Sequence, residues 1–521
     1  MADIVLINPK FNPSFWGLEH ALKLVDVDAI LPTAALSLLA ALTPAEHTIT
    51  LIDEAVDEID WDRCAKADIV GVTGMVVQRA RMREILTELK ARGCFVVVGG
   101  PWVTVKEDYF GNLADVIFVG EAETTWPKFL EDWKAGNYEH RYEQAERTDM
   151  STVPVPRYDL LKMDRYAMNS VQFSRGCPFT CEFCDIIVTF GRRPRIKTEE
   201  QVIAELEGLL KAGIDWAFIV DDNLIGNKKA IKVILRRVAQ WQRDKGYPMS
   251  FLTEASLDLA DDPEMMDLMV ECNVRLVYVG IETPNEESLK ETGKLQNLRG
   301  KRTIADKVHD IQRHGMEVWS GMMLGFDHDD ETIFDRQVAF VEQADIVSCM
   351  VGMVSAIPKT PLYNRLDKAG RLDHDDPPRW GTNIKPIGMQ PETLSAGFLS
   401  VMQRLYEPKT YFDRLERLYA NYDLDRKQSG PRTEYMRKHP WRRIKLNAAL
   451  MAEAAVVFWR ILSAVKDEQL RAQYRKVVGR LIKRRASPQL MQAYALKTAM
   501  HYHVHELVGS MEDGGKIVNP F

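Results

Sequence analysis

Apolar runs alternate with helical hydrophobic patterns over the first 130 residues of the chain. Each run is short and apolar throughout, which is typical of strands buried on both faces of a parallel sheet. The expected strands are 3–9 (DIVLINP), 48–54 (TITLIDE), 68–74 (DIVGVTG), 94–100 (CFVVVGG) and 116–123 (VIFVGEAE). We predict an α/β domain with a doubly wound parallel sheet, whose ligands bind at the carboxyl ends of the strands.

A second alternating series begins near residue 168, after a polar, proline-rich stretch. A helix is expected over 197–213, with Thr198 as its cap and Gly213 as its stop. The expected strands are 169–176 (NSVQFSRG), 216–223 (WAFIVDDN), 249–256 (MSFLTEAS), 275–283 (RLVYVGIET), 317–327 (EVWSGMMLGFD) and 345–358 (DIVSCMVGMVSAIP). Six or so βα units predict a partial or full (β/α) barrel with its active site at the carboxyl ends of the strands.

Strand patterns stop at about residue 385, and helical patterns continue to about residue 507. We therefore expect a helical C-terminal domain followed by a loose tail over 509–521. The predicted divisions of the chain are 1–147 for the first sheet domain, 148–166 for a linker, 167–384 for the barrel and 385–521 for the helical domain.

Charge is distributed unevenly along the chain. The net charge is −7, but residues 401–521 hold 23 Lys and Arg against 12 Asp and Glu. The apolar stretch 446–465 is interrupted by Glu453 and Arg460, so we read it as a buried or interfacial helix. A basic C-terminal region suits peripheral contact with an anionic membrane, although a solvated helical domain with charged faces is the simpler interpretation.

Cysteine usage and the N-terminus indicate the compartment. The seven cysteines are too few for a disulfide framework, and the chain starts without a signal-peptide pattern. We expect a cytoplasmic protein, with the inner face of a membrane as the place of any peripheral contact. The pI of about 6.0 and the lack of a basic, aromatic module predict that it does not bind nucleic acid.

Three of the seven cysteines lie within eight residues, in CPFTCEFC: Cys177, Cys181 and Cys184. A zinc site would need a fourth ligand, and the nearest histidines along the chain are His140 and His309. A disulfide contradicts the reducing compartment. Three thiolates suit a four-iron cluster, in which one iron stays open for a substrate or cofactor.

The spacing Cys-x3-Cys-x2-Cys, with Phe183 before the last cysteine, resembles that of the radical S-adenosylmethionine enzymes. The resemblance implies a [4Fe–4S] cluster whose open iron chelates S-adenosylmethionine, and electron transfer that cleaves it to a 5′-deoxyadenosyl radical. It also implies cofactor contacts at later strand ends, where the alternative is a carboxylate that caps the next helix. The candidate contacts are Phe183, Asp222 (or Asp221) for the ammonium group, Glu254 for the ribose, and Gly280, Glu282 and Gly325.

A doubly wound domain before a radical barrel resembles the cobalamin-binding class of this family. The resemblance implies corrin contacts at Thr73, Gly74, Gly99, Gly100, Trp102, Gly120 and Glu121. The chain lacks the Asp-x-His-x-x-Gly run that places a histidine on cobalt, so the lower face of the cobalt is expected to be either open or met by a group other than histidine. Trp102 is a candidate cover for that face, with ordinary packing as its alternative. Two alternatives exist for the first sheet. One is a Rossmann nucleotide domain, but its Gly-x-Gly-x-x-Gly turn is absent after the first expected strand. The other is a sheet that binds no ligand.

Further stretches resemble the subgroup that contains the hopanoid C-2 methylase and the bacteriochlorophyllide side-chain methyltransferases. They are 9–16 (PKFNPSFW), 183–198 (FCDIIVTFGRRPRIKT) and 382–389 (TNIKPIGM). The resemblance implies methyl transfer from methylcobalamin to an unactivated carbon of a hydrophobic or polycyclic small molecule, with a reductant such as flavodoxin or ferredoxin. The alternatives are a radical enzyme that performs cyclisation, ring contraction or carbon–carbon coupling, and a non-catalytic sensor. The basic run 191–197 would hold an anionic group or form surface ion pairs.

Overall fold

The computed structural model describes residues 1–512 and 516–520. They form two compact units, each built from several segments of the chain. The first unit comprises Met1–Asn12, Asp28–Ile234 and Ala356–Ala369. The second comprises Pro13–Val27, Leu235–Ser355 and Gly370–Phe521.

The first unit begins with a six-stranded, all-parallel sheet in the order β2-β1-β3-β4-β5-β6. The strand order reverses between β1 and β3, and such a switch point opens a crevice at the carboxyl ends of the two strands. The strands are β1 (Asp3–Asn8), β2 (Thr48–Asp53), β3 (Ile69–Thr73), β4 (Val96–Gly99), β5 (Val116–Val119) and β6 (Arg141–Glu143). The predicted doubly wound α/β sheet is confirmed.

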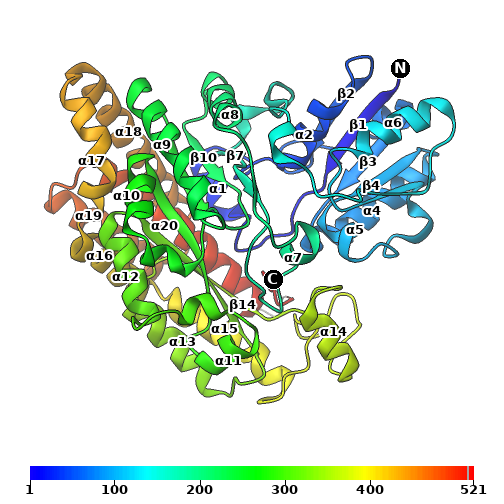
Figure 1. Cartoon of the computed structure of the whole chain (residues 1–521). Helices are drawn as coiled ribbons and strands as arrows, with labels where there is room; N and C mark the ends of the chain where they lie inside the picture. The colour runs from blue at the N-terminus through cyan, green and yellow to red at the C-terminus, as the bar shows by residue number, and fades with distance from the viewer. Residues whose placement is uncertain (513–515, 521) are drawn as a thin grey trace. The chain divides into compact units, whose positions relative to one another are not determined.

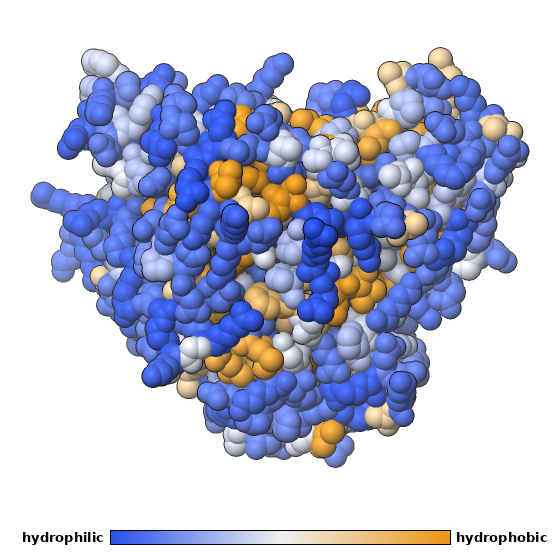
Figure 2. Space-filling model, viewed as in Figure 1, coloured by the Kyte–Doolittle hydropathy of each residue, from blue (hydrophilic) through white to orange (hydrophobic). Residues whose placement is uncertain are grey.

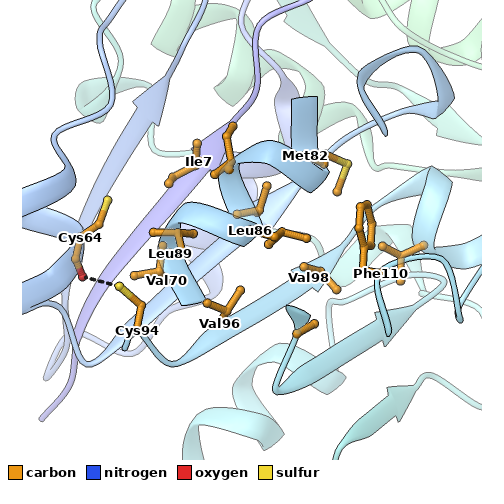
Figure 3. Close-up of a cluster of buried hydrophobic side chains, with 14 of the residues drawn as sticks. Ile7, Cys64, Val70, Met82, Leu86, Leu89, Cys94, Val96, Val98 and Phe110 are labelled. Carbon is orange, nitrogen blue, oxygen red and sulfur yellow. Dashed lines mark hydrogen bonds between the residues drawn. The ribbon is translucent and has the colours of Figure 1, made fainter. Parts of the chain in front are cut away.

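Helices cover both faces of this sheet (Figure 1). Successive residues of a strand point to opposite faces, so Ile4 and Leu6 pack under α2 and α6 while Val5 and Ile7 pack against α4. Figure 3 shows the second of these cores, where Cys94 donates its thiol hydrogen to the carbonyl of Cys64 at 3.7 Å. The helices are α2 (Ala34–Leu42), α3 (Trp61–Lys66), α4 (Arg79–Ala91), α5 (Pro101–Val105) and α6 (Thr125–Ala135).

The rest of the first unit carries the first strands of the second sheet and the cysteine loop. Strand β7 pairs with β10 in parallel, and the short strands β8 and β9 pair antiparallel. Helix α8 starts at the predicted Thr198 cap, where the side chains and backbone N–H groups of Thr198 and Gln201 form a reciprocal capping box. The elements are β7 (Asn169–Val171), β8 (Ser174–Arg175), α7 (Ile186–Thr189), β9 (Arg195–Ile196), α8 (Glu199–Lys211), β10 (Trp216–Ile219) and α14 (Pro361–Lys368).

The second unit contains four further parallel strands, paired in chain order from β11 to β14. The strand order of the whole second sheet is β14-β13-β12-β11-β10-β7, which is a partial barrel with six strands. Helix α9 (Lys228–Lys245) runs from one unit into the other. The elements are β11 (Ser250–Glu254), α10 (Pro263–Glu271), β12 (Val274–Glu282), α11 (Glu286–Glu291), α12 (Ile304–His314), β13 (Glu317–Leu324), α13 (Thr332–Gln343) and β14 (Cys349–Met353).

A helical layer packs on this part of the sheet and confirms the predicted helical C-terminal region. Lys497 in α20 forms a buried ion pair with Glu317 at the start of β13, and Arg414 in α16 pairs with Glu342 in α13. The helices are α1 (Glu19–Val25), α15 (Pro391–Leu405), α16 (Pro408–Tyr422), α17 (Leu424–Arg437), α18 (Pro440–Ala464), α19 (Glu468–Lys483) and α20 (Pro488–Glu512).

Two features differ from the sequence-based expectations. Strand β6 was not predicted, because its sequence Arg-Tyr-Glu carries one buried residue between two exposed charged ones. The tail is not loose where it is described, because the Asn519 amide pairs with the backbone N–H and C=O of Met353 at the end of β14. Residues 513–515 and 521 lie outside the described part of the tail. No described helix or strand crosses the predicted division points after 147, 166 and 384.

Two buried histidines of α20 stay neutral in the folded layer. His501 Nε2 lies 2.9 Å from the Tyr406 carbonyl, which can only accept, so the proton is on Nε2 and the Tyr474 hydroxyl donates to Nδ1. His503 likewise donates from Nε2 to the Ser14 carbonyl at 2.8 Å. Burial lowers the pKa of His501 to about 3 and that of His503 to about 4.

These pKa values predict a loss of stability in mild acid. The unfolded chain protonates both histidines below about pH 6.5 while the folded chain does not, so the free energy of unfolding falls as pH drops from 7 towards 4. We expect a loss on the order of 1–2 kcal/mol per histidine at pH 5. Urea unfolding of the apo-protein at pH 8 and pH 5 measures it. His501→Gln should reduce the difference between the free energies of unfolding at pH 8 and pH 5. An unchanged difference would contradict the assignment of a neutral His501.

Candidate functional site

The carboxyl ends of β3 and β4 meet in a tight backbone contact. Gly100 has a φ of +99°, and a Cβ there would overlap Thr73 Oγ1 and lie 3.0 Å from the backbone nitrogen of Gly74. The backbone N–H of Trp102 donates to the carbonyl of Gly74 at 3.2 Å. Glycine is therefore required at position 100 by both conformation and space. The structure brings the predicted residues Thr73, Gly74, Gly99, Gly100 and Trp102 together at one edge of the sheet.

This edge is tied to the switch point of the sheet. Gln78 follows β3, and its side-chain amide donates to Asn8 Oδ1 at 3.2 Å and to the carbonyl of Pro9 at 2.5 Å. Asn8 in turn donates to Asp53 at 3.0 Å. The loops after β1, β2 and β3 are thus held in fixed positions by buried amide and carboxyl groups.

Trp102 is packed into the core on the α4 side of the sheet. Its ring meets Tyr109 edge-on at 5.0 Å between centroids, and the Arg79 guanidinium lies 5.6 Å from its centre. Its indole nitrogen is buried and has no hydrogen-bond partner among the described residues. Trp102 therefore packs in the core, which was the alternative to a cover for the cobalt face. Its indole N–H, at the carboxyl edge of the sheet, is left as a donor without a partner in the described part of the chain.

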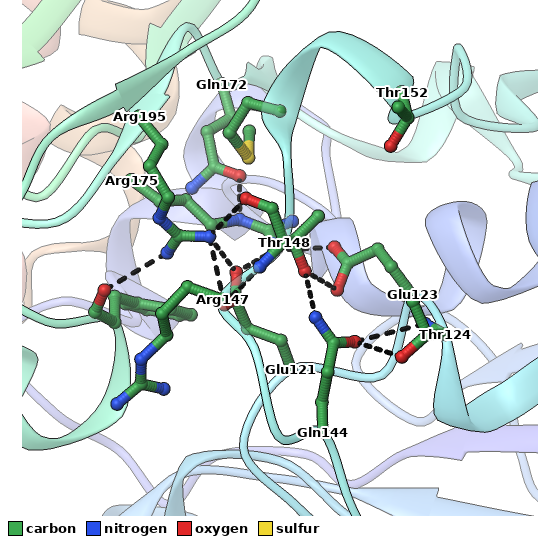
Figure 4. A network of polar contacts seen from close by, with 12 residues as sticks. Glu121, Glu123, Thr124, Gln144, Arg147, Thr148, Thr152, Gln172, Arg175 and Arg195 are labelled. Carbon is green, nitrogen blue, oxygen red and sulfur yellow. Dashed lines mark hydrogen bonds and ion pairs between the residues drawn. The ribbon is translucent and has the colours of Figure 1, made fainter.

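Gly120 and Glu121 follow β5. Gly120 has a φ of +79°, and its N–H donates to Thr104 Oγ1 of α5 at 2.9 Å, which places it beside the β4 end. Glu121 is buried and binds Arg175 and Arg195, both at 2.9 Å (Figure 4). Burial alone would raise the pKa of Glu121, but the hydrogen bonds from the two arginines outweigh it and hold the pKa below its ordinary value. Its carboxylate joins β5 to the strand that precedes the cysteine loop.

The cysteine loop begins with a turn that only glycine can make. Gly176 has a φ of +97°, and a Cβ there would lie 3.0 Å from the carbonyl oxygens of Gly191 and Arg193. The N–H of Cys177 donates to the Gly191 carbonyl at 3.2 Å, and the N–H of Cys184 donates to the Cys181 carbonyl at 3.2 Å. Cys177 and Cys184 are half-buried, and Cys181 is buried.

The chemistry of the loop suits an iron–sulfur cluster. None of the seven cysteines is in a disulfide. Each thiolate of a four-iron cluster binds its own iron, so three sulfur atoms spread along one loop fit such a cluster.

Strand β10 ends beside this loop. Asp222 accepts the Gly176 N–H at 2.6 Å, and the Asn223 amide lies 3.9 Å from Cys177 Sγ. Asp221 is directed to the other side, where it accepts the Phe173 N–H and the Ser174 hydroxyl. Burial raises the pKa of Asp222 to about 6 and that of Asp221 to about 7. Of the two candidates, Asp222 is the half-buried carboxylate next to the cysteines.

The cysteine loop is held from outside by α14. Glu182 lies between Cys181 and Cys184, and Arg365 binds its carboxylate through Nε at 2.7 Å and Nη2 at 3.1 Å. The N–H of Leu362 also donates to the Glu182 carbonyl at 3.0 Å. The sequence analysis missed this clamp, and no local pattern predicts it because the partners are 183 residues apart.

The basic run after the cysteines is used internally. Arg195 belongs to the Glu121 network, Lys197 forms a buried ion pair with Glu205, and Arg192 donates to the Pro178 carbonyl at 3.4 Å. Of these contacts, the one between Arg192 and Pro178 holds the segment against the cysteine loop. A role of the run in holding an anionic group stays a prediction.

The remaining predicted contacts lie at strand ends of the second unit. Glu254 ends β11 and is half-buried. Glu282 ends β12 with a φ of +69° and pairs with Lys294 at 2.5 Å, and a Cβ on Gly280 would contact both side chains. Gly325 follows β13 and donates its N–H to Asp329 at 3.0 Å. Contact of these residues with a cofactor stays a prediction.

Asp329 is a structural residue that sequence reasoning missed. It is buried and also accepts the N–H of Phe326 at 3.1 Å and the Ser288 hydroxyl at 3.1 Å. It thereby fixes the turn that carries Gly325. The signal available was an aspartate four residues after a strand-end glycine, which is typical of a side chain that caps a turn.

Two family models match the chain. Residues 171–335 match the radical SAM superfamily, and residues 360–515 match a domain of unknown function, DUF4070. The first match contains the cysteine loop and strands β8 to β13, and the second begins just before α14.

Several curated proteins are similar over most of their length. An uncharacterized methyltransferase of Synechocystis sp. is 40% identical over 88% of this chain and 83% of its own. The hopanoid C-2 methylase of Rhodopseudomonas palustris is 35% identical over 79% of this chain and 78% of its own. The bacteriochlorophyllide d C-8(2)-methyltransferase of Chlorobaculum tepidum is 24% identical over 66% and 77%.

Solved structures share the fold at lower identity. The radical S-adenosylmethionine methyltransferase TsrM from Kitasatospora setae, solved with cobalamin and a [4Fe–4S] cluster, has a TM-score of 0.63 at 16% identity and covers 85% of this chain and 100% of its own. The cobalamin-dependent radical enzyme OxsB, solved with aqua-cobalamin, has a TM-score of 0.61 at 15% identity over 97% and 84%. With its three-cysteine loop on a parallel βα series and its extended identity to the relatives above, the chain belongs to the radical S-adenosylmethionine superfamily, in the family of the hopanoid C-2 methylase.

Proposed function

We propose that the protein is a cobalamin-dependent radical S-adenosylmethionine methyltransferase that methylates an unactivated carbon of a hydrophobic, polycyclic small molecule. The observation that carries the proposal is the similarity over about four-fifths of the chain to a hopanoid C-2 methylase, combined with a cysteine loop and a glycine-lined strand edge in one compact unit. A reductant such as flavodoxin or ferredoxin would supply the electron, and the cytoplasm is the proposed compartment.

The residues of the cysteine loop fit the cluster. The thiolates of Cys177, Cys181 and Cys184 would bind three irons and leave the fourth for S-adenosylmethionine. When bound, the cluster, S-adenosylmethionine and cobalamin supply a hydrogen-abstracting radical and a methyl group for a carbon that has no nucleophilic character. The clamp of Glu182 by Arg365 and the Gly176 N–H bond to Asp222 would keep the thiolates in place during electron transfer.

Asp222 is the proposed acceptor for the ammonium group of S-adenosylmethionine. It lies next to the cysteines, and an incoming cation would favour its ionised form and counteract the burial that raises its pKa. Phe183, Glu254, Gly280, Glu282 and Gly325 are the proposed further contacts with this cofactor. For Glu282 the existing pair with Lys294 supports a backbone or positioning role rather than direct use of its carboxylate.

The edge formed by β3, β4 and β5 fits a corrin. Thr73, Gly74, Gly99, Gly100 and Gly120 present backbone with little side-chain bulk, which permits close approach of a planar ring. The unused indole N–H of Trp102 offers a donor to a polar group of such a ligand. Glu121 would act through Arg175 and Arg195 by fixing this edge, since its oxygens are already engaged.

Replacement of a cysteine of the loop tests the cluster assignment. Cys181→Ala should lower iron from about four per chain to near zero and abolish reductive cleavage of S-adenosylmethionine, because a buried ligand is lost. Cys94→Ala is the matched control, since Cys94 is a buried packing residue of the first sheet and should retain iron. Iron analysis and detection of 5′-deoxyadenosine after anaerobic reconstitution measure both variants. Cleavage by the Cys181 variant would refute the cluster assignment.

Replacement of Gly100 tests the proposed cobalamin site. Gly100→Ala pushes a Cβ into Thr73 and Gly74, so we expect cobalt content to fall about tenfold or more while iron stays unchanged. Gly93→Ala is the control, because Gly93 also has a positive φ of +76° but no atom within 4 Å of the added Cβ. Equal cobalt loss in both variants would show general destabilisation instead of a local site.

A labelled methyl group tests the proposed reaction. With S-adenosylmethionine carrying a labelled methyl group and a pentacyclic triterpenoid as substrate, we expect one labelled methyl group in place of a hydrogen atom of the substrate, a net gain of CH2. The label should disappear in the Cys181→Ala and Gly100→Ala variants alike. Cleavage of S-adenosylmethionine with a rearranged, unlabelled product would instead favour cyclisation or carbon–carbon coupling.

A further inference from the structure

Helix α18 (Pro440–Ala464) has two apolar faces with different surroundings. On one face Ala454, Val457, Phe458 and Ile461 are buried against the second unit, where α18 packs along α20. This face accounts for the position of the helix in the C-terminal layer. It leaves the opposite face of a 25-residue helix without an internal role.

The opposite face is apolar and turned to solvent. Trp441 is 82% exposed and Trp459 is 68% exposed, and a separation of 18 residues places them on the same side, about 27 Å apart along the axis. Three more exposed apolar side chains flank the line between them: Ile444, Met451 and Val456. Exposed tryptophans at both ends of an apolar stripe are typical of a surface that meets a membrane interface.

Positive charge surrounds the stripe. The segment 440–485 contains twelve Lys or Arg against three Asp or Glu. Arg442 and Lys445 are exposed on α18 itself, within about 100° of Trp441 around the helix axis. Helix α19 packs against α18 and ends in a further group of cations, beside which Ile482 is exposed. Two of these cations, Arg480 and Arg484, also pair with Glu416. An anionic lipid surface complements such a charge, since each basic residue near it is attracted to the headgroups.

Two other occupants of the stripe fit less well. A second copy of the chain would bring two strongly positive segments together around the stripe, which costs free energy. A helix that spans the bilayer would have to leave its packing partners. By length and composition α18 is the one helix within 1–512 and 516–520 that is apolar enough to cross a membrane, but its inner face is part of the core, and Glu453 and Arg460 interrupt it.

In the view of Figure 2 hydrophilic residues cover most of the surface, and apolar residues gather in several patches near the centre of the face. Outside α18, the large apolar side chains that are well exposed are mostly scattered along the chain, for example Leu295 and Ile387. Single exposed apolar residues of this kind need no explanation, whereas a continuous stripe marks an interaction site.

We propose that the outer face of α18 docks the enzyme in the plane of an anionic lipid bilayer, with Trp441 and Trp459 at the headgroup boundary and the basic residues of α18 and α19 against lipid phosphates. The proposal rests on the proposed function in one respect: it names the membrane as the phase from which the enzyme takes its hydrophobic substrate. The surface itself is inferred from the helix alone.

Sedimentation of the reconstituted full-length protein with vesicles tests the proposal. We expect binding to phosphatidylcholine vesicles that contain phosphatidylglycerol, with weaker binding to phosphatidylcholine alone and a decrease in high salt. Trp441→Ala with Trp459→Ala should reduce the partition coefficient about tenfold or more, because the exposed indoles supply the apolar contact. Arg442→Gln with Lys445→Gln should weaken binding to the anionic vesicles only.

Leu295→Ala with Ile387→Ala is the matched control, since it removes two exposed apolar side chains outside α18 and should leave binding unchanged. Iron and cobalt contents equal to wild type establish that each variant is folded. Equal binding by the tryptophan variant, or no binding by the wild type, would overturn the proposal. A tryptophan variant that converts a dimer to a monomer and still binds vesicles would also overturn it, because the stripe would then be a dimer interface. Wild-type protein that stays on vesicles after carbonate extraction would overturn it as well, because α18 would then span the bilayer.

Failure of the proposed function gives a different result. If the wild type in detergent does not cleave S-adenosylmethionine, the radical reaction is refuted, whereas the result for vesicle binding is unaffected. Normal cleavage by every variant, with no difference in vesicle binding, would refute the docking surface alone.

Discussion

Glu121 carries a buried negative charge that two arginines share. Its oxygens bind Arg175 and Arg195, and Arg175 also binds Glu123. A buried charge of this kind is tolerated only when it is fully paired, and removing one partner typically costs about 3–5 kcal/mol. Because Arg175 directly precedes the Gly176–Cys177 turn, the same network fixes the end of β5 and the start of the cysteine loop. The network therefore connects the proposed corrin edge to the proposed cluster loop within the first unit.

The sequence was sufficient for most of the fold for a definite physical reason. Buried parallel strands are apolar on both faces, so each of β1 to β5 and β10 to β14 leaves an apolar run that can be recognised without knowing its partners. Thr198 and Gln201 likewise form a cap from residues three apart. Strand β6 could not be found this way, since an edge strand of three residues with exposed charges has no apolar pattern.

The site was predictable in position but less so in role. Strand ends are local features, and the structure does bring Thr73, Gly74, Gly99, Gly100 and Trp102 to one edge and Asp222 to the cysteines. The use of a side chain depends on residues far away along the chain. Glu121 was predicted as a corrin contact, yet its carboxylate is occupied by arginines 54 and 74 residues away. The clamp of Glu182 by Arg365 is hidden for the same reason.

Tertiary packing gives the two faces of helix α18 different surroundings, which its sequence alone does not predict. Apolar residues predominate in its sequence after Lys445, interrupted by Glu453 and Arg460, and composition alone allows a core helix, a spanning helix or an interfacial helix. Packing against α20 uses one face and leaves Trp441 and Trp459 outside. This division also separates two tasks. The residues proposed for cobalamin and the cysteine loop belong to the first unit, whereas the exposed stripe belongs to the second. The proposed substrate, if drawn from a bilayer, would need both parts. Radical chemistry requires cofactors shielded from solvent, whereas access to a bilayer requires an apolar surface that is exposed.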